Sequence, residues 1–248
     1  MTAARESVVS LAEGIHLHVV EWGAPRGWPV VILHGGGHDA TCWDEVCRRL
    51  PGRLRWIVPD QRGHGGSDWS PEGDYSCAAQ ARDLEQLLRA LRIERCALVG
   101  HSMGGLNALE YAASHPGKVT ALVLVDVGTE TRETGLQRIR RRIDQPRPVD
   151  SDGRRARFDA RLLQFVPTYC GDTARRRELL ARVEAPLLVV RGEHSRILSA
   201  ESAALTARLG KGSVAEIPGA GHSVSLDNPQ AVAECLVRFL VPLAKGAA

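Results

Sequence analysis

Short apolar runs alternate with longer amphipathic segments along most of the chain, and this alternation restricts the fold more than any other feature of the sequence. The runs that we expect to form strands are 16–21, 30–33, 56–58, 97–99, 121–125, 187–190 and 214–217, with a further strand near 7–10. The segments that we expect to form helices are 41–50, 76–91, 102–114, 200–209 and 229–240. Strands that alternate with helices build a mostly parallel central sheet with helices on both faces. The sequence therefore predicts an α/β fold.

The alternation stops after Asp126 and starts again at Pro186. Residues 128–184 contain no strand pattern and hold 14 arginines and 9 acidic residues in a polar sequence that is compatible with helices. We interpret 128–184 as a small helical lid inserted into one α/β core, which residues 1–127 and 185–248 form. A chain of 248 residues is long enough to bury one sizeable core of this kind.

The many arginines of the lid raise the question of a nucleic-acid partner. They are interleaved with acidic residues, and no aromatic platform on which bases would stack lies beside them. Such a mixed run is typical of a solvated helical surface. The net charge of +3 adds no argument for an anionic partner, so we expect no nucleic acid to bind.

Several signals bear on the compartment and on cofactors. Residues 1–14 lack the apolar stretch of a secretory signal, and no apolar run approaches the length of a membrane span. The 6 cysteines form no C-x-x-C pair, so we expect reduced thiols in the cytoplasm and no membrane partner. No histidine or cysteine spacing is typical of zinc, and the glycines at 35–37 lack the frame of a phosphate loop. We therefore expect neither a metal nor a cofactor.

The strongest local motif is CALVGHSMGG at 96–105, in which an apolar run leads through G-x-S-x-G into a helix-compatible segment. In this context the motif indicates a nucleophile elbow, a tight strained turn that holds a serine hydroxyl above the ends of the strands. The serine is Ser102, and Gly100 and Gly104 leave room for the turn. The helix that starts here presents the Met103 N–H to an oxyanion that develops beside Ser102.

A second glycine-rich stretch, VVILHGGGHDATCW at 30–43, follows an early apolar run. Glycine allows the backbone to approach a substrate carbonyl closely, because no side chain intervenes. His34 opens this loop, and two roles are open to it: a catalytic group, or a buried side chain that orders the loop through hydrogen bonds. We favour the second role, since buried polar side chains commonly bond to backbone groups.

His222 lies in EIPGAGHSVSLDNP at 216–229, after the last predicted strand and before the last predicted helix. A general base for Ser102 must come from a loop at the edge of the sheet that carries the elbow, where the carboxyl ends of the strands meet. Among the 9 histidines, His222 has this context. We therefore predict that His222 accepts the proton of Ser102. His101, beside the nucleophile, is expected to support the elbow instead of reacting.

Taken in order, these motifs resemble those of the α/β-hydrolase fold family. The matching segments are HGGG at 34–37, PDQRGHGGS at 59–67, GHSMGG at 100–105 and GAGH at 219–222. The similarity covers nearly the whole chain apart from the lid, and it implies the α/β-hydrolase fold, a Ser–His–acid triad and two backbone donors for an oxyanion. By this resemblance, the second donor beside Met103 is the N–H of Gly36, with that of Gly37 as the alternative.

The resemblance leaves the acid of the triad to be found. In this family the acid commonly follows the strand before the last one, at the position that Ser195 occupies here. Neither Ser195 nor the following Arg196 can form a carboxylate. Some members of the family, including haloalkane dehalogenases and certain lactone hydrolases, carry the acid after the preceding strand instead. Two residues of this chain are candidates, Asp126 and Glu193.

Physical arguments favour Asp126, which follows an apolar run beside the elbow strand, where an unpaired carboxylate is costly to bury. A hydrogen bond to His222 removes that cost, and a buried carboxylate fixes the tautomer of the histidine and stabilises its protonated form. The other interpretation of Asp126 is a cap for the first lid helix. Glu193 lies in a polar loop, where solvation explains it, and we keep it as the alternative acid. The loop around Ser195 is then expected to support His222 sterically.

These residues predict a serine hydrolase that cleaves a carboxylic ester or a lactone through an acyl-enzyme, with Ser102, His222 and Asp126 as the triad. Two alternatives stay open. The same triad hydrolyses a carbon–carbon bond of β-diketone-like substrates in sister families, and a non-catalytic ligand-binding protein keeps the same fold. The expected partner is a small molecule with an ester, lactone or related carbonyl group. The sequence specifies neither the substrate nor the oligomeric state.

Overall fold

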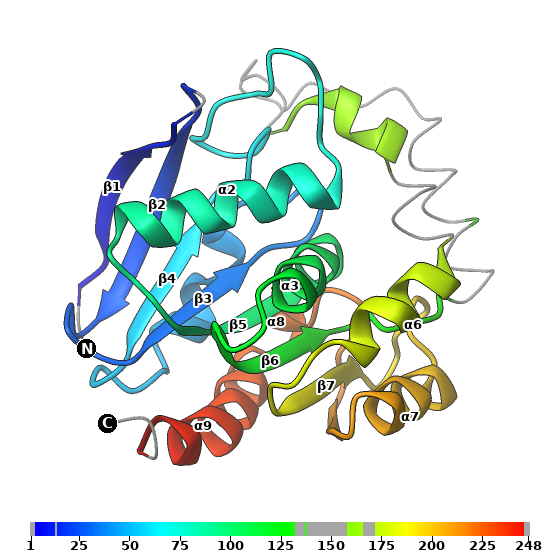
Figure 1. Ribbon diagram of the computed structural model, residues 1–248. Helices are drawn as coiled ribbons and strands as arrows, with labels where there is room; N and C mark the ends of the chain where they lie inside the picture. Colours follow the sequence, from blue (N-terminus) through cyan, green and yellow to red (C-terminus); the bar gives the residue numbers. More distant parts are fainter. Residues whose placement is uncertain (1–2, 13, 132–136, 138–157, 166–171, 246–248) are drawn as a thin grey trace, which may run out of the picture.

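The structure is a computed structural model that describes residues 3–12, 14–131, 137, 158–165 and 172–245. Much of the predicted lid lies outside the described residues, namely 132–136, 138–157 and 166–171. The boundaries of the lid at 128 and 184 therefore stay a prediction. In the described part of the chain, helices flank both faces of a central sheet (Figure 1).

The sheet has eight strands in the order β1-β2-β4-β3-β5-β6-β7-β8. They are β1 (Arg5–Ser10), β2 (His16–Gly23), β3 (Pro29–Leu33), β4 (Arg55–Pro59), β5 (Cys96–His101), β6 (Val119–Val125), β7 (Leu187–Gly192) and β8 (Ser213–Ile217). β2 pairs antiparallel with β1 and with β4, and the other neighbouring strands pair parallel. The predicted mostly parallel sheet is confirmed, and each predicted run, including the early one, forms a strand.

Two layers of helices cover the sheet, and each layer shares an apolar cluster with it. The helical elements are η1 (Ala40–Trp43), α1 (Asp44–Cys47), α2 (Cys77–Ala90), α3 (Met103–Ser114), η2 (Ala160–Phe165), α6 (Thr173–Ala181), α7 (Ala200–Leu209), α8 (Val224–Asp227) and α9 (Pro229–Lys245). Residues of α2, α3 and α7 belong to the cluster on one face, and residues of α1, α8 and α9 to the cluster on the other (Figure 1).

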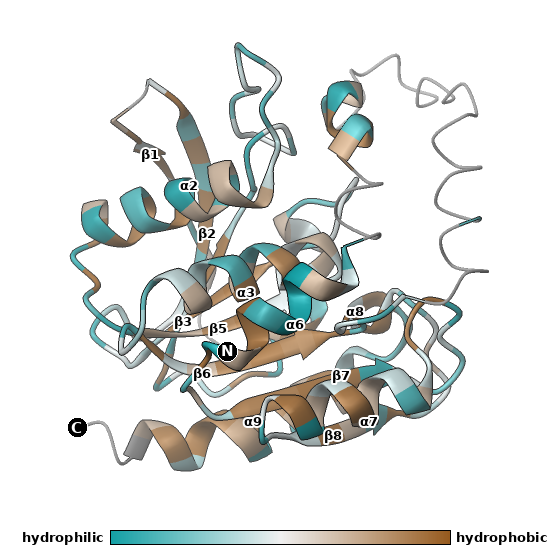
Figure 2. Ribbon diagram, turned by 45° about the vertical axis from the view of Figure 1, so that its right-hand side comes forward, coloured by the Kyte–Doolittle hydropathy of each residue, from teal (hydrophilic) through white to brown (hydrophobic). Residues whose placement is uncertain are grey.

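The central strands are buried on both faces, which explains their continuous apolar sequences. Every residue of β5 and β7 is buried, as is every residue of β6 except Thr120. Figure 2 shows β6 and β7 largely in hydrophobic colours. Parallel strands that helices cover on both sides have this pattern. The edge strand β1 differs, because most of its residues are exposed.

Two helices depart from the predicted ranges. The predicted helix 41–50 is a 3-10 turn, η1, followed by one α-helical turn, α1. Pro51 disfavours helical backbone at the preceding Leu50, and this restricts how far the helix can extend. The last helix, α9, runs to Lys245 instead of ending at 240, because its apolar residues continue to pack against the second cluster.

The described residues 158–165 of the predicted lid lie against the loop that follows β4. Phe158 forms a β-bridge with His64, and its ring stacks on the imidazole with the centroids 5.8 Å apart. The buried Tyr75 hydroxyl donates a hydrogen bond of 2.5 Å to the Asp159 carboxylate. These contacts fix this part of the predicted lid on the core.

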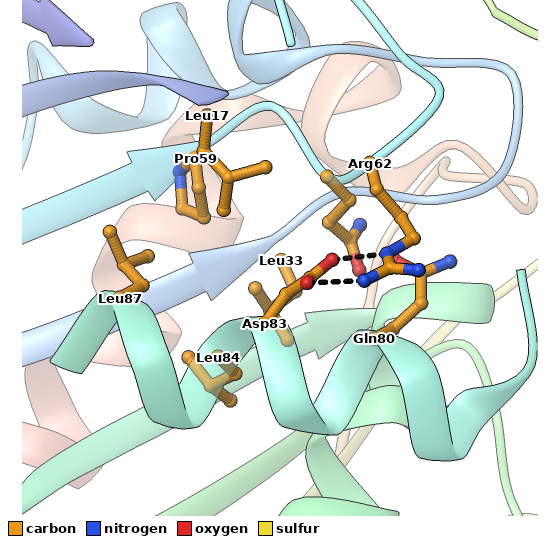
Figure 3. Close-up of a pocket in the computed structure, with 9 residues that line it drawn as sticks. Leu17, Leu33, Pro59, Arg62, Gln80, Asp83, Leu84 and Leu87 are labelled. Carbon is orange, nitrogen blue, oxygen red and sulfur yellow. Dashed lines mark hydrogen bonds and ion pairs between the residues drawn. The ribbon is translucent and has the colours of Figure 1, made fainter. Parts of the chain in front are cut away.

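A buried ion pair joins the loop after β4 to α2. The guanidinium of Arg62 donates two hydrogen bonds to the Asp83 carboxylate, and the bond from Nη2 to Oδ1 is 2.5 Å long (Figure 3). The two side chains are 3% and 6% exposed. Leu17, Leu84 and Leu87 line the same small pocket. Removing one charge of such a pair leaves the other in apolar surroundings, which is strongly destabilising.

We therefore expect Arg62→Met to lower the free energy of unfolding by about 3–5 kcal/mol, measured by urea unfolding. The matched control is Arg89→Met on the outer face of α2, which removes the pair between Glu85 and Arg89, whose side chain is 71% exposed. An exposed pair of this kind contributes little. Equal decreases in the free energy of unfolding for the two variants would contradict a larger contribution of the buried pair to stability.

Candidate active site

Ser102 lies in a strained turn between β5 and α3. Its backbone has φ 50° and ψ −116°, a conformation that residues with a side chain rarely adopt. The turn is packed so closely that a Cβ atom on Gly104 would lie 2.5 Å from the carbonyl oxygens of Leu33 and His34. Glycine is therefore required at position 104. Strand, strained serine and helix follow one another as the motif predicts.

Three loops bring Ser102, Asp126 and His222 together at the carboxyl edge of the sheet. Ser102 follows β5, Asp126 follows β6, and His222 lies in the loop after β8. His222 Nε2 is 3.1 Å from the Ser102 hydroxyl, and His222 Nδ1 is 2.7 Å from Asp126 Oδ2. These distances suit the tautomer in which Nδ1 donates to Asp126 and Nε2 accepts from the Ser102 hydroxyl.

Asp126 is fully buried, and its backbone is left-handed with φ 50°. Its Oδ1 accepts a hydrogen bond of 3.0 Å from the Gly192 N–H. Its Oδ2 accepts from the Ser195 hydroxyl at 2.6 Å as well as from His222. The carboxylate thus has three donors, which offset the cost of burying its charge. The alternative role of Asp126, a cap for the first lid helix, is wrong, because residues 127–131 form no helix and the carboxylate bonds to Gly192, Ser195 and His222.

Glu193, the alternative acid, bonds to a backbone group instead of His222. Its side chain is 45% exposed, and Oε2 accepts a hydrogen bond of 2.7 Å from the Gly219 N–H. The loop that carries Glu193 nevertheless packs against the loop of His222, since the His194 N–H donates to the Ala220 carbonyl at 2.8 Å. The structure therefore places Asp126, and not Glu193, against His222, and the expected steric support is present.

The glycine loop after β3 lies beside the elbow. A Cβ atom on Gly36 would lie 3.8 Å from Met103 Cβ and 3.8 Å from Leu162 Cδ2 of the predicted lid. The Gly37 N–H donates to His64 Nε2 at 3.1 Å and is therefore engaged. The Gly36 N–H has no hydrogen-bond partner among the described residues. Met103, as the first residue of α3, has no earlier carbonyl of the helix to bond. This geometry favours Gly36 over Gly37 as the second donor.

A chain of hydrogen bonds holds the glycine loop in place. His34 Nδ1 donates to the Gly35 carbonyl at 2.9 Å, and His34 Nε2 accepts from the Gln61 N–H at 2.9 Å. The Gln61 side chain donates to the His34 carbonyl at 2.6 Å and accepts from Asn107 Nδ2 at 2.8 Å. The prediction that His34 orders the loop is confirmed. Gln61 and Asn107 were not singled out from the sequence, because their partners lie far away along the chain.

His101 also contributes to the arrangement without contacting the serine hydroxyl. It is buried, and its Nε2 donates to the backbone carbonyl of His222 at 2.7 Å. The two imidazole rings lie 4.8 Å apart. Burial lowers the pKa of His101 well below its ordinary value, so the ring is neutral at neutral pH. His101 therefore tethers the loop of His222 to the elbow.

Within the residues that the structure describes, no group of three or more His, Cys, Asp and Glu side chains is arranged to hold a metal ion. None of the helices in the described part has the length and apolar character that crossing a bilayer requires. The carboxyl edge of the sheet presents the side chains of a serine, a histidine and an aspartate beside backbone N–H groups.

A nucleophile elbow, an adjoining glycine loop and a histidine after the last strand define the class of α/β hydrolases. Comparison with known proteins agrees, since the model of the alpha/beta hydrolase family matches residues 30–235. The chain belongs to the alpha/beta hydrolase family. A crystal structure of an alpha/beta hydrolase from Novosphingobium aromaticivorans has a TM-score of 0.80 and 28% sequence identity, over 99% of each chain.

Two curated relatives differ in how much of them the chain covers. The 2-(acetamidomethylene)succinate hydrolase of Mesorhizobium japonicum is 30% identical over an alignment 258 positions long, which covers 91% of this chain and 92% of that protein. An uncharacterized protein of Mycobacterium tuberculosis is 41% identical over 113 residues, which are 46% of this chain and 33% of that protein. The match thus spans about a third of the length of that second relative.

The buried histidines of the loops make stability depend on pH. Burial lowers the pKa of His34 to about 4 and that of His64 to about 3, from 6.5. Below pH 6.5 the unfolded chain binds protons at these residues and the folded chain does not. We therefore expect the free energy of unfolding to fall by up to roughly 1.4 kcal/mol per pH unit for each of these histidines as the pH falls from 6 toward 4. The contribution of His34 levels off near its folded pKa of about 4.

Urea unfolding at pH 7, 6, 5 and 4 measures this slope. His64→Gln should make it shallower, because one titrating group is lost. The control is His194→Gln, whose imidazole is 67% exposed and meets solvent in both states. A stability that does not change over this range would contradict the assignment of neutral, buried imidazoles.

Proposed function

We propose that this protein is a serine hydrolase that cleaves a carboxylic ester or a lactone through an acyl-enzyme. The observation that carries the proposal is the hydrogen-bonded chain from Ser102 through His222 to the buried Asp126. The N–H groups of Gly36 and Met103 belong to backbone segments that lie together beside the serine. A fold does not specify a reaction, but a nucleophile, a base, an oriented acid and two backbone donors are the groups that acyl transfer uses.

In the first half of the proposed reaction, His222 Nε2 accepts the proton of Ser102 while the hydroxyl oxygen attacks the substrate carbonyl carbon. The carbonyl oxygen becomes negatively charged and accepts hydrogen bonds from the N–H groups of Gly36 and Met103. The carbon–oxygen bond then breaks, and His222 donates its proton to the departing alkoxide. The acyl group stays on Ser102.

In the second half, a water molecule replaces the alcohol. His222 accepts a proton from the water, whose oxygen attacks the acyl carbon, and the same two N–H groups stabilise the second oxyanion. His222 then returns the proton to Ser102 as the acid is released. Asp126 holds the imidazole in the tautomer with a free Nε2 lone pair and stabilises the imidazolium.

The surroundings of the donors bear on the substrate class. Met103 Sδ and Leu162 Cδ2 lie 3.6 Å and 3.8 Å from the position that a Cβ atom on Gly36 would occupy. Both are apolar, so we expect an uncharged group next to the reacting carbonyl. The name of the Mesorhizobium relative, a hydrolase of an acetamidomethylene succinate, supports a small carbonyl compound as the substrate.

The proposal predicts a defined ranking of variants. Ser102→Ala should abolish turnover of p-nitrophenyl esters and lactones, and Asp126→Asn should lower kcat by about 10⁴-fold with an intact fold. Glu193→Gln should change kcat little, because its carboxylate bonds to the Gly219 N–H instead of His222. Steady-state kinetics and circular dichroism measure these effects.

A fluorophosphonate probe separates the enzyme from a binding protein, since it labels an activated serine covalently. Labelling of wild type and not of Ser102→Ala supports the proposal, and no labelling of wild type contradicts it. A β-diketone in the substrate panel tests carbon–carbon hydrolysis by product analysis. A larger effect of Glu193→Gln than of Asp126→Asn would move the acid to Glu193.

A further inference from the structure

We infer that Ser195 is a positioning residue of the site, whose hydroxyl donates to the Asp126 carboxylate and holds it in the orientation that His222 requires. The inference rests on the proposed function. Ser195 stands at the position where the family resemblance led us to expect the acid, and the loop after β7 serves the same histidine in a different way. It supplies a proton donor to the acid in place of the acid itself.

The hydrogen bonds around Ser195 fix the direction of its hydroxyl. Its Oγ accepts from the N–H groups of Ile197 and Leu198, each at 3.1 Å. Both lone pairs are therefore occupied, and the proton is left for Asp126 Oδ2 at 2.6 Å. Ser195 is 3% exposed and Asp126 is 0% exposed, so solvent does not compete for this bond.

The same carboxylate oxygen receives Ser195 and His222. Asp126 Oδ2 is 2.6 Å from the serine oxygen and 2.7 Å from His222 Nδ1, while Oδ1 is held by the Gly192 N–H. With a donor on each oxygen besides the histidine, the carboxylate cannot rotate about its side-chain bonds without losing a hydrogen bond. Its orientation toward His222 is thus set by the last residue of β7 and by the loop that follows it.

The consequence for the reaction lies in the chemical steps and not in substrate binding. Ser195 is bonded to Asp126 and to the backbone of its own loop, and Asp126 lies beyond His222 as seen from Ser102. Loss of the hydroxyl should loosen the imidazole in the transition state, which lowers kcat and leaves KM nearly unchanged. A charge-assisted hydrogen bond of this kind corresponds to about a tenfold decrease in kcat.

A double-mutant cycle tests whether Ser195 acts through Asp126. Wild type, Ser195→Ala, Asp126→Asn and the double variant are compared by kcat and KM with p-nitrophenyl butyrate and by the rate constant for fluorophosphonate labelling. We expect Ser195→Ala to lower both rates about tenfold in the wild-type background and to have little further effect beside Asp126→Asn. An equal decrease in both backgrounds would overturn the inference.

Two further comparisons separate positioning from folding. Ser195→Thr keeps the hydroxyl, whereas Ser195→Val has the shape of threonine with a methyl group in place of the hydroxyl. The kcat of Ser195→Thr should therefore be about tenfold higher than that of Ser195→Val. The matched control is Ser67→Ala, another buried serine, whose hydroxyl donates to the Asp60 carbonyl at 2.6 Å and accepts from the His18 N–H at 2.8 Å. It should lower the melting temperature without a comparable loss of kcat.

The outcomes distinguish this inference from the proposed function. If Ser102 is not labelled in wild type, the proposed function fails. If Ser102 is labelled but Asp126→Asn alone keeps full activity, Asp126 is not the acid and the inference on Ser195 fails. If Asp126→Asn is strongly impaired while Thr and Val at position 195 have equal kcat, the inference on Ser195 fails and the proposed function stands. If Ser195→Ala does not fold, the comparison of Thr with Val decides in its place.

Discussion

The buried carboxylate of Asp126 is the interaction on which the site depends. A charge with no solvent exposure is tolerated in this protein because three donors reach it: the Gly192 N–H, the Ser195 hydroxyl and the His222 imidazole. Gly192 ends β7 and Ser195 lies in the loop that follows it, whereas His222 comes from the loop after β8. The parallel order β5-β6-β7-β8 brings these segments to one edge of the sheet. The burial of the Asp126 carboxylate therefore depends on the strand order, which places its hydrogen-bond donors.

A second set of constraints holds the backbone donors beside Ser102. His34 and His64 are buried and neutral, and as neutral imidazoles each can accept a backbone N–H, from Gln61 and Gly37 respectively. The bond to His34 fixes the start of the glycine loop. The bond to His64 engages the Gly37 N–H, and the Gly36 N–H stays available to a substrate. Preorganised donors of this kind act on a developing charge without reorganising, which is where the electrostatic contribution to acyl transfer arises.

Local features of the site were predictable from the sequence. The elbow needs only a strand, a strained serine between glycines and a helix, all within 96–105, and the structure shows that order. The choice of Asp126 over Glu193 as the partner of His222 followed from burial, because an apolar strand cannot end in an uncompensated carboxylate. The hydroxyl of Ser195 was not predictable, since its partner is 69 residues away. The hydrogen bond between Gln61 and Asn107 was not predictable for the same reason.

The sequence by itself determined the α/β class, the family and the residue types of the site, because periodicity and short motifs depend on neighbours along the chain. Tertiary structure decided which side chains bond to the glycine loop, which donors besides His222 reach Asp126 and which way the Ser195 hydroxyl points. These depend on contacts between loops that are distant in sequence, and no local pattern encodes them. The position after β7 makes the difference plain: as sequence it is a missing acid, and in the folded protein it is a donor to the acid one strand away.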